Sequence, residues 1–105
     1  MTTATFYSRD GRWCGFRLEG HSDDVPAGES ILCAAVSSAA YLTANTVTEV
    51  CGCAASAEER DGFLSLSVSE ADVPRCQTAL EGFHLHMKML QEQYPDNILL
   101  DYTEV

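Results

Sequence analysis

One short window of the sequence brings together an imidazole and a thiol, the two groups from which a sulfur nucleophile is assembled. His21 follows Gly20, and eleven residues separate it from Cys33. A thiolate needs a nearby base to remove its proton and a local positive potential to stabilise its charge. The elements on either side of this window therefore decide whether both conditions can be met.

The positive potential would come from a helix that begins just before the cysteine. Ser30 is predicted to be its N-cap, because the serine hydroxyl can accept an amide proton of the first turn. The apolar and small residues from Ile31 to about Val50 then predict the helix itself. Cys33 would be its third residue, among unpaired amides that favour the thiolate and can donate to an oxyanion.

The base would come from the other side of a loop. Residues 22–29 contain Gly, Pro and acidic residues and are expected to form a mobile loop. This loop is long enough to place His21 beside the sulfur, where it would polarise the thiol and later protonate a leaving amine. Ser37 lies one turn after Cys33 on the same helix face and could orient the pair or bind substrate backbone.

The remainder of the chain predicts an α+β two-layer sandwich. Asp10-Gly11 is a favoured tight-turn pair between two strands. The element order is ββαββαβ in one domain, residues 1–105, with a mainly antiparallel sheet and two helices packed on one face. Besides the helix at 31–50, the predicted elements are strands at 3–8, 12–19, 51–57, 62–68 and 98–103 and a helix at 73–94.

Composition narrows the class of protein. The chain has 105 residues and a formal net charge of −10, from sixteen acidic and six basic residues. It offers no basic patch to neutralise phosphates, which disfavours direct nucleic-acid binding, whereas a basic partner would be attracted. The N-terminus has no apolar signal region and no eighteen apolar residues run together, so we expect a cytoplasmic protein without a membrane partner.

The other cysteines and histidines favour structural roles. Cys51 and Cys53 form a lone Cys-x-Cys, which lacks the second ligand pair of a typical structural metal site, so neither a metal nor another cofactor is expected. Cys14 and Cys76 fall on inward-facing positions and should be inert. A further pair, His84 and His86, is expected to be packed or partly exposed rather than ligating.

The Gly20-His21-Ser22 element, the acidic spacer and the sequence Ile-Leu-Cys-Ala-Ala-Val-Ser at 31–37 resemble the ribosomal-processing cysteine protease family Prp. That family has a Gly-His-Ala element, a spacer of this length, and a hydrophobic-Cys-Ala-small-small-Ser helix start. The resemblance covers essentially the whole chain. One departure is Ser30, where family members often have Asp three residues before the cysteine; either residue can cap a helix.

The resemblance implies a homodimeric endopeptidase. Its substrate would be the N-terminal extension of a basic large-subunit ribosomal protein, number twenty-seven, removed before ribosome assembly. By position, His21 matches the family histidine, Cys33 the nucleophile and Ser37 the helix serine. Asp23, Asp24 and Glu29 would close over the peptide, and an apolar groove is expected beside the cysteine because the cleaved extension ends in aromatic residues.

Two other readings of the residues stay open. A non-catalytic acidic module for ribosome assembly or protein binding would need no nucleophile. A metal or redox-sensing role would depend on Cys51 and Cys53 instead. Replacement of Cys33 separates all three, because only the enzyme would lose its function.

Overall fold

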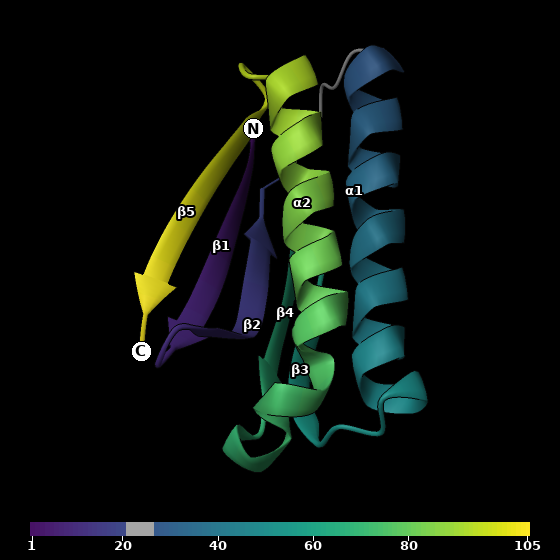
Figure 1. Cartoon of the computed structure of the whole chain (residues 1–105). Coiled ribbons are helices and arrows are strands. Elements are labelled where there is room, and N and C mark those ends of the chain that lie inside the picture. Colours follow the sequence, from purple (N-terminus) through teal and green to yellow (C-terminus); the bar gives the residue numbers. More distant parts are fainter. Residues whose placement is uncertain (21–26) are drawn as a thin grey trace.

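The computed structural model describes residues 1–20 and 27–105. The element order in the described chain is ββαββαβ, as the sequence predicts. The elements, shown in Figure 1, are β1 (Thr2–Arg9), β2 (Arg12–Glu19), α1 (Ala27–Asn45) with its π-helical continuation η1 (Thr46–Val50), β3 (Ala55–Arg60), β4 (Phe63–Val68), the 3₁₀ segment η2 (Glu70–Cys76), α2 (Gln77–Gln93) and β5 (Ile98–Glu104).

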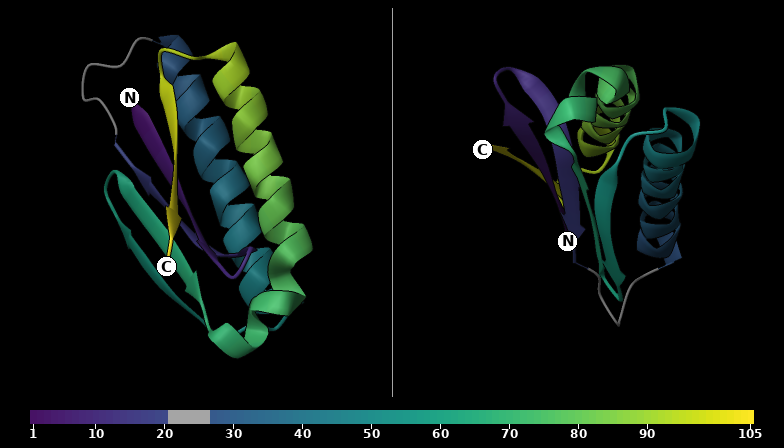
Figure 2. Two further views of the ribbon diagram at one scale, coloured as in Figure 1. Left: turned by 60° about the vertical axis from the view of Figure 1, so that its left-hand side comes forward. Right: turned by 90° about the horizontal axis from the view of Figure 1, so that it is seen from below.

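Within residues 1–20 and 27–105, five strands form one sheet in the order β3-β4-β2-β1-β5. Neighbouring strands are antiparallel except β1 and β5, which run parallel. The β1–β2 turn has positive φ at Asp10 (52°) and Gly11 (78°), the conformation that a two-residue hairpin favours. Helices α1 and α2 lie side by side over one face of the sheet, as Figures 1 and 2 show, which confirms the predicted sandwich.

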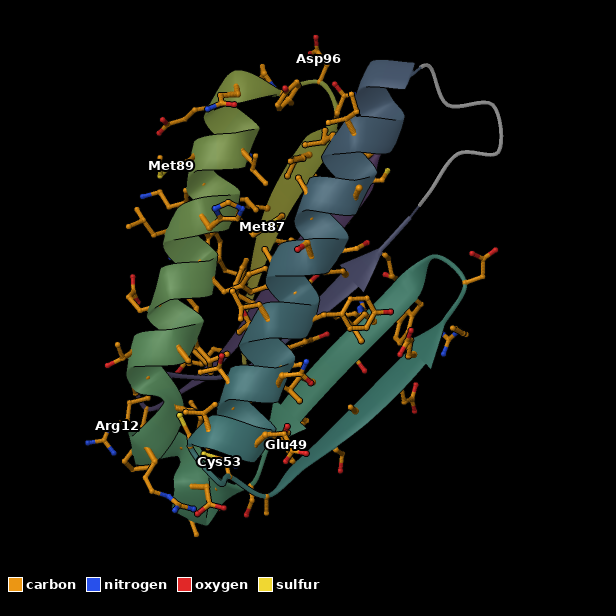
Figure 3. The ribbon with its side chains drawn as sticks, turned by 90° about the vertical axis from the view of Figure 1, so that its right-hand side faces the viewer. Arg12, Glu49, Cys53, Met87, Met89 and Asp96 are labelled. Carbon is orange, nitrogen blue, oxygen red and sulfur yellow. The ribbon has the colours of Figure 1, made fainter. Side chains whose placement is uncertain are left out.

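The core lies between the sheet and the helices. Phe16 and Leu18 of β2 are buried, as their alternation with polar residues predicts. Met87 of α2 is fully buried, whereas Met89 is half exposed, and Figure 3 shows them on different sides of the helix. Burial of each large apolar side chain contributes about 1.5–3 kcal/mol. The remaining members of the core from α1, η1 and α2 are Leu32, Val36, Ala40, Val47, Leu80 and Phe83.

Helix α1 begins earlier than the sequence predicts. Ala27, Gly28 and Glu29 belong to its first turn rather than to a loop, and Ser30 lies inside the helix instead of capping it. The sequence has Pro26 directly before this start, and proline is favoured at the beginning of a helix. The predicted end at Val50 is correct, because η1 extends α1 to that residue.

The second hairpin has a tighter turn than predicted, and its first strand begins at Ala55 rather than at residue 51 and ends at Arg60 rather than at residue 57. The charged run from Glu58 to Arg60, expected in a connection, continues β3 and pairs with β4. Because β3 is an edge strand, its charged side chains can remain exposed. Likewise, Pro74 lies in η2 and not in the first turn of α2, since the 3₁₀ segment extends to Cys76.

In the described part of the chain, one helical segment, Ile31–Val50, is long and apolar enough to cross a membrane by length and composition. Leu32, Val36 and Val47 from this segment are buried in the same cluster as sheet residues such as Leu66. The segment is therefore the helix of a core layer in a compact globule.

Candidate active site

The exposed side of α1 forms one wall of a pocket. Cys33, Ser37 and Tyr41 recur every four residues and so lie along one side of the helix. All three line a pocket of about 540 Å³ whose opposite wall is the tip of the β3–β4 hairpin. Figure 3 shows the position of this hairpin beside α1. The sequence-predicted Cys33 and Ser37 are thus brought together at one surface.

Both apolar and charged residues line the pocket. Leu18, Val36 and Leu64 supply apolar surface close to Cys33. Glu19 and Arg60 are among the charged residues that border it. The pocket thus offers both apolar and charged surface beside the thiol, and the groove for an aromatic residue stays a prediction.

Gly20 holds the end of β2 at this pocket. Its amide donates a hydrogen bond of 2.9 Å to the carbonyl of Gly62 in the β3–β4 turn. Its φ is +110°, and a Cβ at this position would lie 2.2 Å from the carbonyl oxygen of Met1. Only glycine fits here without a shift of the backbone, so the residue that precedes His21 is fixed where three segments of the chain meet.

The structure leaves part of the predicted site undescribed. His21, Asp23 and Asp24 lie outside the described residues, and so does the predicted contact between imidazole and sulfur. Glu29 and Ser30 are described only as part of the backbone of α1. Gly20, Cys33 and Ser37 are the predicted site residues that the structure places at one pocket.

Because α1 begins earlier than predicted, Cys33 lies further inside the helix. Cys33 is the seventh residue of α1, in its second turn, rather than the third. By the α-helical pattern its amide bonds to the carbonyl of Glu29, so it is not one of the free amides of the first turn. The influence of the helix dipole also decreases within the first turn. The side chain of Cys33 is half-buried at the pocket wall, where a substrate carbonyl could reach its sulfur.

The pocket also includes Tyr41 on the α1 wall and several residues of the opposite wall, none of which the sequence predicted. Tyr41 could have been found, because it continues the four-residue spacing of Cys33 and Ser37. Glu59 and Phe63 carry no such signal, since only the folding of the hairpin beside α1 brings them to the pocket. Arg60 stacks its guanidinium over the ring of Phe63, 3.8 Å from the ring centre.

The other cysteines lie away from this pocket. Cys53 and Cys76 are buried, and their thiols donate to the carbonyls of Asp72 and Val73, respectively. Burial, together with neighbouring Cys53, raises the pKa of the Cys76 thiol to about 11, so the prediction of an inert Cys76 agrees with its environment. No group of three or more His, Cys, Asp or Glu side chains in the described part is arranged to hold a metal ion.

Cys14 packs against the core cluster but is less buried than Phe16. A bulge, where β1 and β2 change register, interrupts the alternation, and Cys14 is half-buried in a groove with Arg9 and Arg17. Burial raises the pKa of its thiol, and the nearby Arg9 opposes that shift.

His84 is a packed side chain, as predicted. Its Nε2 lies 2.7 Å from the hydroxyl of Tyr102, and its ring lies against the rings of Phe6 and Trp13. His86, at the next position but one, is exposed.

The chain is similar to known proteins in both sequence and structure. Residues 1–99 match the sequence model of the family described as cysteine protease Prp. No curated protein matches the chain. The solved structure of the ribosomal processing protease Prp from S. aureus with a substrate peptide is 21% identical, covers 98% of this chain and 100% of its own, and gives a TM-score of 0.87.

Two further solved structures share the fold. The S. aureus protease with a covalently linked product peptide is 22% identical over 98% of this chain and 100% of that one, with a TM-score of 0.86. SMU.848 from Streptococcus mutans is 25% identical over 100% of this chain and 99% of that one, with a TM-score of 0.83. These likenesses extend over the whole sandwich, and the family match covers all but its last residues. The chain belongs to the cysteine protease Prp family and is therefore a hydrolase.

Proposed function

We propose that this chain is a cysteine endopeptidase that removes the N-terminal extension of a large-subunit ribosomal protein, number twenty-seven, before ribosome assembly. The observation that carries the proposal is the position of Cys33 at the wall of a pocket that Gly20 also lines. Gly20 directly precedes His21 in the sequence, so the proposed base is connected to the same pocket as the proposed nucleophile.

The proposed reaction is acyl transfer through a thioester. The sulfur of Cys33 attacks the scissile carbonyl while His21 accepts the thiol proton. As the C–N bond breaks, His21 returns this proton to the leaving amine, and water then hydrolyses the thioester with the same imidazole as base. The S. aureus relative has been solved with a covalently linked product peptide, which supports a covalent route for its relatives.

The pocket supports an extended peptide with an apolar side chain near the scissile bond. Leu18, Val36 and Leu64 provide the apolar surface beside Cys33. The net charge of −10 would attract a basic ribosomal protein to the enzyme. Asp23 and Asp24 stay predicted contributors to that attraction, and Ser37 a predicted contact for substrate backbone. Glu29 lies in the first turn of α1 rather than in the predicted loop, and its contribution to that attraction stays a prediction.

The functional unit that we propose is a cytoplasmic homodimer. Large apolar side chains on the helices remain exposed, among them Leu42 (69%), Leu85 (56%) and Met89 (52%). A second copy that covered this surface would bury area that a monomer leaves in water. Sedimentation at micromolar concentration should give about twice the mass of the chain. A monomer throughout that range would contradict the dimer and leave the peptidase proposal intact.

The peptidase proposal is tested by removing its nucleophile. Cys33→Ser should lower cleavage of a peptide that spans the ribosomal-protein extension by at least about 10³-fold, because a serine hydroxyl at this position would not ionise near neutral pH. His21→Ala should lower it by a comparable factor, since residues that act as a unit are not additive. A single-turnover digest read by mass spectrometry measures both.

Cys51→Ser is the matched control, because it removes a thiol far from the pocket. It should cleave at nearly the rate of the unmodified chain. Unimpaired cleavage by Cys33→Ser would refute the mechanism. Full binding of the ribosomal protein without any cleavage by the unmodified chain would favour the non-catalytic module instead.

A further inference from the structure

A hydrogen bond spans the pocket from one wall to the other. The hydroxyl of Tyr41, on α1, donates to a carboxylate oxygen of Glu59, on β3. Both side chains line the pocket, and both are exposed to solvent at its border. The bond therefore joins the helix that carries Cys33 to the hairpin opposite it.

The position of this bond relative to the thiol follows from helix geometry. Tyr41 comes eight residues after Cys33, which places it about 12 Å further along α1 at 1.5 Å per residue. Ser37 lies between them on the same side. The Tyr41–Glu59 bond thus limits the pocket at the end away from the turn of the hairpin, where Gly20 holds Gly62.

The outer strand of the hairpin, β3, makes few contacts with the rest of the fold, so a hydrogen bond from α1 can hold it in place. In the described sheet β3 is an edge strand whose hydrogen-bonding neighbour is β4. From Ser56 to Arg60 its residues are all exposed. Exposed edge strands with few buried contacts belong to the least stable parts of a fold. A change in the angle of this hairpin would alter the width of the pocket directly.

We propose that Tyr41 is a positioning residue of the peptidase: its hydrogen bond to Glu59 holds the β3–β4 hairpin against α1 and sets the width of the pocket in which the peptide meets Cys33. This inference rests on the proposed function. Glu59 raises the pKa of the Tyr41 phenol, because the hydrogen bond favours the protonated form that donates it.

The competing explanation for Glu59 is direct attraction of a basic substrate by its charge. The two explanations differ for Glu59→Gln, whose amide oxygen still accepts from Tyr41 but carries no charge. Positioning requires the acceptor, whereas attraction requires the charge. Steady-state cleavage of the extension peptide by Tyr41→Phe, Glu59→Ala and Glu59→Gln separates them.

Tyr41→Phe and Glu59→Ala should each raise KM about fivefold, the factor expected for one exposed hydrogen bond, and change kcat less than about twofold. The double variant should be no worse than either single one, because both remove the same bond. Glu59→Gln should restore KM to within about twofold of the unmodified enzyme. Tyr102→Phe is the matched control, since it removes a tyrosine hydroxyl bonded to His84 instead.

Hydrogen exchange provides a readout that does not need cleavage. Amides of β3 should exchange faster in Tyr41→Phe than in the unmodified chain, and those of β5 should not change. Unchanged KM and unchanged exchange in Tyr41→Phe would overturn the positioning role while leaving the peptidase intact. Equal damage from Glu59→Gln and Glu59→Ala would overturn it in favour of charge attraction. Failure of the peptidase proposal itself would be recognised separately, by unimpaired cleavage in Cys33→Ser.

Discussion

Helix α1 and its continuation η1 have cysteines near both ends. The surroundings of the thiol differ between the two ends. Near the first end, Cys33 lines a pocket that apolar and charged residues share. Just beyond the other end, Cys53 is buried in the core cluster together with Cys76. Residue type therefore does not decide which thiol is available for chemistry; the surroundings of each sulfur do.

The buried end is closed by backbone hydrogen bonds as well as by packing. The amide of Cys53 donates to the carbonyl of Val47 at 3.0 Å, and its thiol approaches the carbonyl of Asp72 at 3.6 Å. The Asp72 carboxylate in turn accepts the amide of Ala54 at 2.7 Å and pairs with Arg75. A substrate carbonyl has no route to a sulfur held in this way, so this end serves stability.

The largest expected contrast between the two ends is in reactivity toward an alkylating agent. With iodoacetamide at pH 8, Cys76 should react at least about 100-fold more slowly than Cys33, because a thiol of pKa about 11 holds little thiolate and is also buried. Peptide mass spectrometry after timed quenching measures each site. Reaction of Cys76 within a factor of about ten of Cys33 would remove the distinction between the two ends.

The same shift predicts how stability depends on pH. The folded state keeps the Cys76 proton until pH about 11, whereas the unfolded chain loses it near the ordinary cysteine pKa. The contribution is thus fully present below the unfolded pKa and is lost as the pH rises toward the folded one. In the alkylation experiment, labelling in denaturant is the control, because both thiols should then react alike.

A smaller effect tests the rigidity of the pocket end. Gly20→Ala should lower the free energy of unfolding by about 1–3 kcal/mol, because it places a side chain at positive φ and against the carbonyl of Met1. Chemical denaturation monitored by circular dichroism measures the change. Gly82→Ala, in α2 with open space around it, is the matched control and should gain up to about 1 kcal/mol from helix propensity. Equal stability of the two variants would mean that Gly20 does not anchor the pocket.

The layers of the fold could be predicted because they depend on local patterns. Alternation identified Phe16 and Leu18, and Asp10-Gly11 identified the first turn. The start of α1 could not be placed in the same way, since Gly28 and Glu29 are read as a loop before Ser30 as readily as in a first turn. Local signals for caps and breakers compete within a few residues, and the folded chain selects one of them.

The site was predictable on one wall only. Cys33 and Ser37 share a helical spacing, so one periodic pattern places both. Glu59 comes from a charged stretch that resembles a connection, and its approach to Tyr41 depends on how the hairpin is oriented beside α1. Contacts between segments distant in sequence leave no trace in local periodicity, which is why the opposite wall emerged only from the fold.

The parallel pairing of β1 with β5 has a practical consequence for anyone who handles this enzyme. Thr2 lines the pocket, and β5 runs away from it, so residues 1 and 105 lie toward opposite ends of the sheet (Figure 1). A purification tag or surface tether joined before Thr2 would emerge beside the cleft and compete with substrate. Attachment after Val105 would leave the pocket open.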